Sequence, residues 1–399
     1  MSRTARAALL GALCALLLGP AAAGAIQTVA YSDGITQRGI AAIAAGPDGN
    51  LWFTERDGRV GRITTDGTVT EFVGSGPLLA IAAGADGAIW FSETLPDAGA
   101  ALGSVTVDGT VRGGFPIGPP PGSVLSLASG PDGALWFTLL GAEQNVGRMT
   151  TAGAVTRYAS TYGPSQPEQI AAGPDGALWY AEGGSFIEPE HPSAGTTFRG
   201  LVRITTAGAI TPFPLRARGV RPFDLTAGPD GALWFTASGP AQQIGRMTTT
   251  GRYTLFDARA PRNRFLGSIV SGPDGNLWYT VGGGRVGRIT RRGLVTIFRT
   301  PSRAVAPGDL AVGSDGNLWM TATRAIVKIV PPRGRCVVPR LVGLRFAGAK
   351  RRLHRANCTV GAVAAPRRAH RSRLVVQHQF PHHGARLPAE SAVDVMLRR

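Results

Sequence analysis

Hydrophobic and polar positions repeat along most of this chain with a period of about 40 residues. A ten-residue stretch, Gly-Pro-Asp-Gly-Asn-Leu-Trp-Phe-Thr-Glu at 46–55, returns six more times in variant form. The later copies begin at Gly84, Gly130, Gly173, Gly228, Gly272 and Gly313. All 7 tryptophans lie in this motif, and successive ones are 38, 46, 43, 55, 44 and 41 residues apart. Self-similarity at such a period indicates a repeat architecture.

Each repeat has the pattern of four short strands. In the first repeat, apolar residues 43–45 lead into a Pro-Asp-Gly turn, and residues 51–54 return with alternating side chains. Residues 60–64 form the third strand, and Asp66-Gly67 is a hairpin turn before the fourth strand at 68–72. A four-stranded unit of this length is typical of a propeller blade. The sequence therefore predicts an all-β, seven-bladed β-propeller over residues 26–330.

The last repeat lacks its fourth strand. Residues 310–312, 318–321 and 325–329 supply three strands before Pro331-Pro332 ends the pattern. Residues 26–31 have the character of a fourth strand, with no earlier strand as a partner. We expect this N-terminal strand to complete the seventh blade, which would hide sheet edges that promote aggregation.

The repeated tryptophans have two interpretations. They could form a ring that stacks on a ligand, or they could pack one blade against the next. A position filled in every repeat serves the repeat itself. The second interpretation is therefore favoured.

The N-terminus has the features of a secretory signal peptide, which we place at residues 1–25. Arg3 and Arg6 precede an apolar run at 7–18, and small residues follow up to Ala25. The run is too short to span a bilayer, and no other segment of the sequence has transmembrane character. We expect export, with the protein secreted or extracytoplasmic. Cleavage removes Cys14 and leaves Cys336 and Cys358, which would form one disulfide in an oxidising compartment.

Charge divides the chain unevenly. The net charge is +17, yet the residues from Pro331 onward hold 15 Lys+Arg and 2 Asp+Glu, a net of +13. The preceding 330 residues carry the remaining 27 and 23, a net of +4. No basic groove interleaved with aromatic residues is apparent, so we do not expect a nucleic-acid partner.

A second domain follows the repeats. Residues 331–335 read as a linker, and residues 336–399 form a small α+β domain. An amphipathic helix is predicted, with Leu344, Ala347, Leu353 and Ala356 on its apolar face. Strands are predicted at 374–376 and 393–397.

This C-terminal segment resembles a PASTA domain. The residues that match the family pattern are Val338, Pro339, Leu341, Gly343, Ala349, Leu353, Ala356, Val376, Gln379, Pro381, Gly384 and Val393. Asn357 and Glu390 stand where glycine is common in that family. The resemblance implies an extracytoplasmic domain associated with recognition of muropeptides or β-lactams, and therefore peptidoglycan as a partner. The arginine-rich face either contacts an anionic cell-wall polymer or is simply solvated.

The repeat region resembles the virginiamycin B lyase family, also called streptogramin lyases. The resemblance rests on Gly-Pro-Asp-Gly-x-Leu-Trp-Phe-Thr-Glu and on the following Val-Gly-Arg-Ile-Thr at 60–64. It implies a seven-bladed propeller that opens the ester ring of type B streptogramins by elimination, with magnesium as cofactor. Such chemistry needs a general base and a cation that polarises the ester.

The family's catalytic histidines lie five residues before the motif glycine, and a metal-binding glutamate ends the motif. The histidine positions here hold Ala41, Leu79, Leu125, Glu168, Phe223, Gly267 and Gly308. The glutamate positions hold Glu55, Glu93, Leu139, Glu182, Ala237, Val281 and Ala322. Glu168 and Glu182 are therefore the candidate catalytic residues, and Glu55 and Glu93 are candidate acids at the rim of the central channel. Alternatively, these are exposed glutamates without a catalytic role. An insertion at 183–199 would lie near the channel mouth.

Without the family's histidines, we expect a monomeric binding or scaffold protein with a small-molecule or protein ligand at the propeller and a cell-wall tether. The alternative is a divergent streptogramin-type lyase, or another metal-assisted enzyme, that acts at the channel.

Overall fold

The computed structural model describes residues 26–36, 39–74, 76–95, 99–117, 122–140, 145–159, 167–183, 199–261, 263–300, 308–331, 336–355, 358–366, 374–387 and 391–398. The predicted signal peptide at 1–25 lies outside these residues, as does nearly all of the predicted insertion at 183–199. The chain divides into two units, Ile26–Arg333 and a unit that includes Gly334–Arg399.

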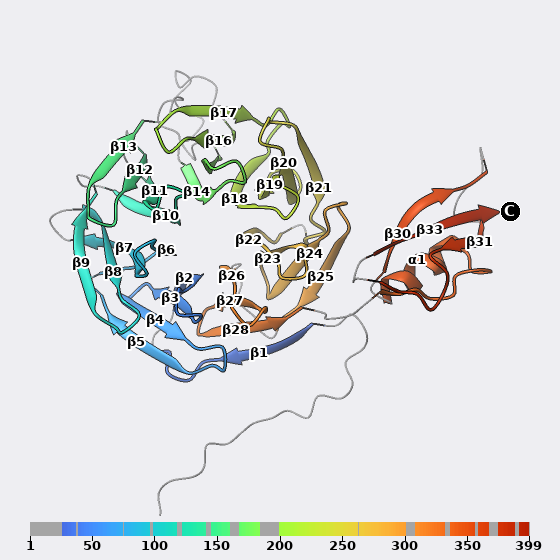
Figure 1. Cartoon of the computed structure of the whole chain (residues 1–399), viewed down its shortest axis with the longest axis horizontal. Coiled ribbons are helices and arrows are strands. Elements are labelled where there is room, and N and C mark those ends of the chain that lie inside the picture. The colour runs from blue at the N-terminus through green and yellow to red at the C-terminus, as the bar shows by residue number, and fades with distance from the viewer. Residues whose placement is uncertain are drawn as a thin grey trace, which may run out of the picture. The chain divides into compact units, whose positions relative to one another are not determined.

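Ile26–Arg333 forms a ring of seven four-stranded antiparallel sheets, which confirms the predicted seven-bladed propeller (Figure 1). Blades one and two contain β2 (Ile40–Ala45), β3 (Leu51–Glu55), β4 (Arg59–Ile63), β5 (Val69–Val73), β6 (Ile81–Ala83), β7 (Ile89–Leu95), β8 (Gly99–Val105) and β9 (Val111–Pro116). Blades three and four contain β10 (Ser123–Ser129), β11 (Leu135–Leu140), β12 (Val146–Met149), β13 (Val155–Tyr158), β14 (Pro167–Ala172), β15 (Leu178–Glu182), β16 (Gly200–Ile204) and β17 (Ile210–Pro214). Blades five and six contain β18 (Arg221–Ala227), β19 (Leu233–Ser238), β20 (Gln243–Met247), β21 (Tyr253–Asp257), β22 (Leu266–Ser271), β23 (Leu277–Val281), β24 (Arg285–Ile289) and β25 (Val295–Arg299).

Blade seven joins the two ends of the propeller sequence. It contains β26 (Leu310–Val312), β27 (Leu318–Ala322), β28 (Ala325–Val330) and, as its outer strand, β1 (Gln27–Tyr31). β1 pairs antiparallel with β28, from Gln27 opposite Val330 to Tyr31 opposite Ile326. The prediction that the N-terminal strand completes the last blade is confirmed.

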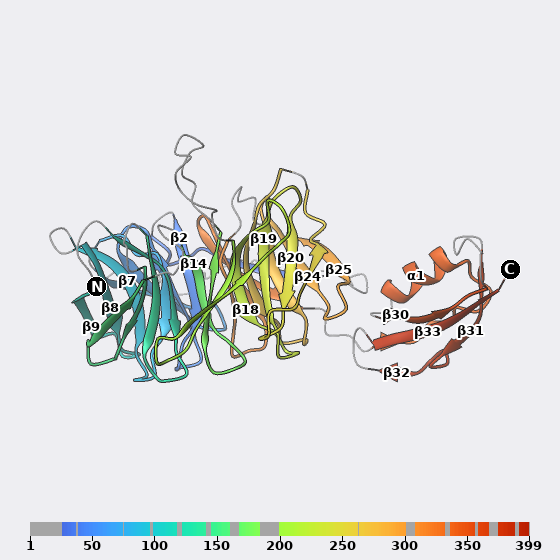
Figure 2. The same ribbon diagram turned by 90° about the horizontal axis from the view of Figure 1, so that it is seen from above.

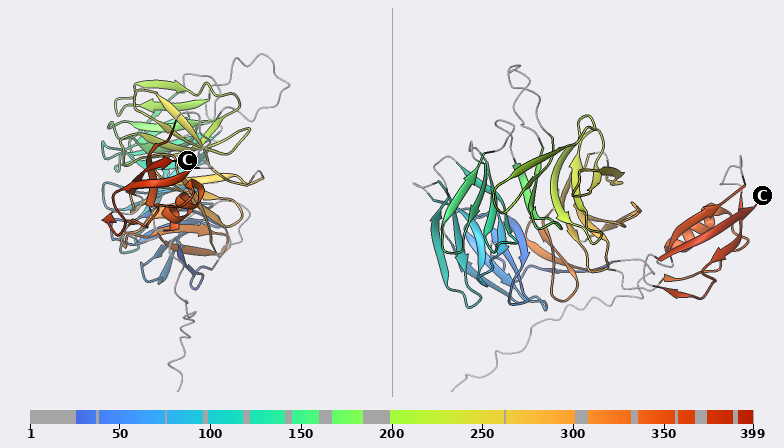
Figure 3. Two further views of the ribbon diagram at one scale, coloured as in Figure 1. Left: turned by 90° about the vertical axis from the view of Figure 1, so that its right-hand side faces the viewer. Right: turned by 45° about the horizontal axis from the view of Figure 1, so that its top comes forward.

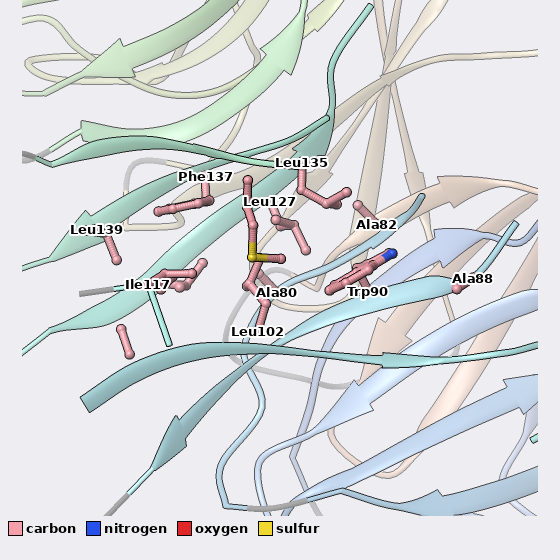
Figure 4. Packing of buried hydrophobic residues seen from close by; sticks show 13 residues of the cluster. Ala80, Ala82, Ala88, Trp90, Leu102, Ile117, Leu127, Leu135, Phe137 and Leu139 are labelled. Carbon is pink, nitrogen blue, oxygen red and sulfur yellow. The ribbon is translucent and has the colours of Figure 1, made fainter. Parts of the chain in front are cut away.

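The tryptophans pack the blades together. Each is at most 1% exposed. Each stacks on or tilts against an aromatic ring of the outer strand of its own blade, for example Trp319 on Tyr31 at 5.6 Å between ring centroids. Each also shares a buried cluster with the next blade, as Trp90 does with Leu135 and Phe137 (Figure 4). The packing interpretation is confirmed at every joint of the ring.

The Pro-Asp-Gly turns fix the tryptophans through their aspartates. In all seven blades the indole Nε1–H donates a hydrogen bond to the aspartate four residues earlier, as from Trp234 to Asp230 at 2.9 Å. The third-strand arginine binds the other oxygen in several blades, as Arg246 Nε does to Asp230 at 2.6 Å. These turns are therefore structural, and their carboxylates are already engaged.

A buried threonine in the second strand links neighbouring blades. Thr236 Oγ1 accepts the Asp224 N–H of its own blade at 3.2 Å and donates to the Gly267 carbonyl of the next blade at 2.9 Å. Thr138 and Thr280 make the corresponding bonds to the next blade, both at 2.7 Å. Three joints between neighbouring innermost strands are thus linked by a threonine side chain. Figures 2 and 3 show the blades from other directions.

The C-terminal unit has one helix and five strands among its described residues, which agrees with the predicted α+β class. β30 (Cys358–Ala364), β33 (Ser391–Arg398) and β31 (Val375–Phe380) form a sheet in that order, and β29 (Cys336–Val337) pairs with β32 (Arg386–Leu387). Figure 2 shows α1 (Phe346–Arg355) lying along one side of the sheet. In the described part of the chain, no helix is long and apolar enough to cross a membrane.

The predicted apolar face of the helix is confirmed at Leu353 and at Leu344, which packs against the same cluster, and is wrong at Ala347, while Ala356 lies outside the described residues. Phe346, Ala349 and Leu353 are buried against the sheet, whereas Ala347 is exposed. The spacing of three and four residues from Phe346 sets the buried face, because such residues share one side of a helix. Cys358 is buried in the same cluster, but the Cys336 side chain lies outside the described residues, so the predicted disulfide stays a prediction.

Candidate functional site at the propeller axis

The innermost strands of the seven blades surround the axis of the ring (Figure 1). Neighbouring blades lie on both sides of each inner strand and the second strand lies behind it. Inner-strand side chains that reach solvent therefore do so along the axis or at the two ends of the strand, and we call the part along the axis the axial surface. In most blades this strand contains an irregularity at the positions four and five residues before the motif glycine, as between Pro222 and Leu225 in β18.

The structure shows the surroundings of the seven positions that correspond to the family's catalytic histidines. Phe223 is 39% exposed, although its strand is the innermost of blade five. Leu79, Leu125 and Ala41 are half-buried, and the Gly267 and Gly308 positions carry no side chain. Glu168 alone brings a charged group to this ring of positions. At these seven described positions the side chains are mainly apolar, and none is an imidazole.

Glu168 is half-buried on β14, at the irregularity between Pro167 and Ile170. A side chain added at Gly183 would lie 3.9 Å from its Oε1, which places the carboxyl beside the end of β15. Burial raises the pKa of the Glu168 carboxyl above its ordinary value and is the sole cause of the shift. Glu182 lies on the neighbouring strand β15, where it is paired with Pro167, the residue before Glu168.

Glu182 ends β15 and is fully buried. Its charge contributes, after burial, to a raised pKa of the Tyr180 hydroxyl, so these two groups are neighbours. Alternate residues of a strand share one face of the sheet, and Glu182 and Tyr180 are so related. The structure therefore brings Glu182 together with Tyr180.

The two proposed rim acids lie inside their blades. Glu93 is 2% exposed, and its Oε1 accepts a hydrogen bond from the Gly114 N–H of β9, the outer strand of blade two. Glu55 is fully buried, and burial, then the charges of Glu71 and Asp57, raise its pKa to about 7. Glu71 belongs to the outer strand β5. Both carboxyls therefore face the outer strands of their blades.

Two aspartates that the sequence analysis did not select lie close together on the inner strands. Asp224 belongs to β18 of blade five, and Asp309 directly precedes β26 of blade seven. Ser268, from blade six between them, makes a hydrogen bond with each carboxyl. Asp224 also accepts the Ile269 N–H at 2.7 Å, and Asp309 accepts the Ile43 N–H at 2.9 Å. Each aspartate therefore joins its own blade to the next.

These surroundings favour the protonated carboxyl. Burial, then the charge of Asp309, raise the pKa of Asp224 to about 7, and burial also raises the pKa of Asp309. Backbone hydrogen bonds oppose the shift in both cases. Solvent still reaches part of each side chain. A carboxyl with a pKa near neutrality is suited to exchange a proton.

One feature of the sequence could have indicated this group. The position four residues before the motif glycine holds Ala42, Ala80, Ser126, Gln169, Asp224, Ser268 and Asp309. Aspartate occurs there in two blades only, so the repeat does not require it. The proximity of Asp224 and Asp309 across blade six becomes visible only in the folded ring.

The residues present do not fit the magnesium that the family resemblance implies. A magnesium site needs carboxylates that converge on one point. Glu55 and Glu93 face the outer strands of two different blades, and Glu182 lies beside Tyr180. In the part of the chain that the structure describes, no three His, Cys, Asp or Glu residues come together to hold a metal ion.

Several solved structures are similar to this protein over most of its chain, in the propeller region. A streptogramin B lyase structure is 26% identical, has a TM-score of 0.66, and the match covers 78% of this chain and 99% of that one. A catalytically inactive virginiamycin B lyase from Staphylococcus aureus, solved with quinupristin, is 25% identical with a TM-score of 0.67 and coverage of 76% and 99%. The WD40 β-propeller domain of Doa1 is 15% identical with a TM-score of 0.58 and coverage of 77% and 96%, a likeness of fold alone. No curated protein sequence matches the chain.

The model of the virginiamycin B lyase family matches residues 22–186 and 196–334, which is most of the chain and includes every described residue of the propeller. Taken with the seven closed blades and the recurring Trp motif, this match shows that the chain belongs to the virginiamycin B lyase family.

Proposed function

We propose that this member of the family is an exported binding protein whose axial surface takes a ligand with an apolar face and does not cleave it. The observation that carries the proposal is the set of side chains at the family's histidine positions. Phe223, Leu79 and Leu125 offer apolar surface there, and no imidazole is present to accept a proton. Apolar walls with a few polar groups are typical of small-molecule sites.

The C-terminal unit supports a location at the cell wall. Its sequence resembles a PASTA domain, and its single helix packs on a three-stranded sheet with Val338, Leu341 and Leu353 in one buried cluster. We propose that it tethers the propeller to peptidoglycan or to an associated polymer. A disulfide between Cys336 and Cys358 would stabilise so small a unit by about 3 kcal/mol.

Quinupristin is a suitable probe, because the relative from Staphylococcus aureus was solved with it. We expect calorimetry to detect binding to the full mature chain. Phe223→Ala should weaken binding about tenfold, since burial of a phenylalanine contributes about 1.5–3 kcal/mol. Val73→Ala is the matched control, because Val73 is 71% exposed but lies on the outer strand β5. Equal weakening by both variants, or none by Phe223→Ala, would contradict binding at the axis.

A second function is favoured by one observation, the raised pKa of Glu168 at a histidine position. A carboxylate with a raised pKa is a stronger base, and it could remove the proton that starts an elimination. Ring opening by elimination moves a proton and breaks the ester C–O bond without changing mass. Chromatography with tandem mass spectrometry is therefore needed to detect the linear product.

The same incubation separates the two functions. Intact cyclic quinupristin, with or without magnesium, is the outcome expected for a binding protein. A linear product that disappears in Glu168→Gln would establish the lyase. If Glu182→Gln alone abolished the product, Glu168 would not be the base.

A further inference from the structure

Helix α1 presents an uninterrupted cationic surface. Its sequence, Phe-Ala-Gly-Ala-Lys-Arg-Arg-Leu-His-Arg, has no acidic residue. Lys350, Arg351 and Arg352 are exposed, and so is Arg345 directly before the helix. The apolar residues Phe346 and Leu353 are turned inward and are 6% and 1% exposed.

The acidic side chain described in this unit lies on the other face of the sheet. On β33, Val393, Val395 and Leu397 are buried in the cluster that includes the helix residues. Asp394 alternates with them and is exposed, so it points away from α1. Among the described residues of the unit, no acidic group faces the helix cations, and no ion pair involves them.

The cations fan out around the helix instead of converging. Successive residues of an α-helix are about 100° apart, so Lys350, Arg351 and Arg352 cover roughly 200° of its circumference. A single small anion reaches only part of such a surface. A flexible chain with regularly spaced anions reaches all of it. Arginine also pairs well with phosphate, because its planar fork binds two oxygens at once.

We infer that the exposed face of α1 binds a flexible polyol-phosphate polymer, a chain of phosphate diesters without nucleobases, outside the cytoplasm. A lipid surface fits less well, because interfacial helices insert large apolar side chains, and here Phe346 and Leu353 are used in the unit's own core. The inference deepens the proposed tether and rests on it for the location. Binding by the purified protein does not depend on export, so the two can fail separately.

The test measures binding of the full mature chain to purified poly(glycerol phosphate) at low salt. The variant Lys350→Gln/Arg351→Gln/Arg352→Gln keeps good helix formers and removes three positive charges. We expect binding to weaken about a hundredfold, from roughly fivefold for each cation near an anionic surface. Binding by the unaltered chain should also fall steeply as salt rises.

The control is Arg291→Gln/Arg292→Gln/Arg324→Gln, which removes the same charge from exposed positions on the propeller. It should bind the polymer nearly as well as the unaltered chain. Equal loss in both triple variants would show a general charge effect and overturn the assignment. Stronger binding to phosphatidylglycerol vesicles or to an oligonucleotide of equal charge would overturn the choice of polymer. Retention by peptidoglycan stripped of phosphate polymer, unchanged in the α1 variant, would overturn the role of α1.

Discussion

Asp224 and Asp230 lie six residues apart in one blade, yet their surroundings shift their pKa values in opposite directions. Burial and the neighbouring Asp309 raise the pKa of Asp224 to about 7. Burial also acts on Asp230, but hydrogen bonds from Trp234 and Arg246 outweigh it and lower the pKa. Asp224 therefore keeps its proton up to near-neutral pH, whereas Asp230 is a stable carboxylate.

The first prediction concerns Asp224 and pH. In the unfolded chain its carboxyl loses the proton near its ordinary pKa of 3.8, whereas the folded protein keeps it until about pH 7. At pH values below 3.8 the Asp224 carboxyl therefore does not lower the stability of the folded protein. As pH rises from there to about 7, the carboxyl destabilises the folded protein progressively. The stability of the Asp224→Asn variant relative to the unaltered chain should therefore rise by roughly 2 kcal/mol from pH 4 to pH 8. A cost that does not depend on pH is added, because the amide keeps only one of the two oxygens that accept the Leu225 and Ile269 N–H groups. Thermal unfolding of both chains between pH 4 and 8 measures this difference.

Asp230→Asn is the control for that series. The contribution of Asp230 is present above its ordinary pKa and is lost as pH falls through the lowered value. This variant should therefore be less stable at pH 8, which is the opposite sign. If the relative stability of Asp224→Asn instead fell from pH 4 to pH 8, the carboxyl would be an anion that the inter-blade hydrogen bonds require.

At the scale of elements, the blades are joined by side-chain bonds that no strand pattern displays. Thr236 Oγ1 receives the Asp224 N–H and donates to the Gly267 carbonyl of blade six. Valine has nearly the shape of threonine but neither donates nor accepts. Thr236→Val should destabilise the propeller by about 2–4 kcal/mol, because two buried backbone groups lose their partner. Urea unfolding gives the change in free energy.

Thr211→Val is a suitable comparison for that measurement. Thr211 lies on the outer strand β17 and is exposed, so its replacement should change stability by less than about 0.5 kcal/mol. Similar costs for the two variants would mean that loss of a threonine hydroxyl, and not loss of the link between blades, sets the effect.

The strands could be predicted wherever the sequence repeats, but the directions of individual side chains could not. The Trp motif fixes the second strand of every blade, since a position filled seven times averages out local ambiguity. The direction of Glu93 depends on the irregularity near Gly114 of β9, which lies 21 residues away. In the C-terminal unit, β30 was missed and Ala347 was wrongly placed on the buried face of the helix, because a single short copy offers no repetition to correct such errors.

At the scale of the whole molecule, closure of the ring brings together residues that are far apart in the sequence. Asp224 and Asp309 are 85 residues apart along the chain, and only closure over blade six places Ser268 between them. The apolar axial surface likewise exists only when seven inner strands meet. The sequence did identify which residues occupy the seven positions of the family's histidines, because each blade could be compared with the others position by position.

Closure itself depends on one short strand. β1 gives blade seven its outer edge, and Tyr31 of β1 stacks on Trp319 while Trp319 also packs against Leu51 and Phe53 of blade one. A chain that starts at Ser32 would leave β28 as an unpaired edge and expose that cluster. We expect it to melt at least 10 °C lower and to aggregate, because open sheet edges pair with other chains.

Removal of 336–399 should leave the propeller transition in place, since the core of that unit is built from its own residues. Calorimetry with light scattering compares the two truncations. An unchanged propeller transition in the chain that starts at Ser32 would mean that the contacts between blades close the ring without β1.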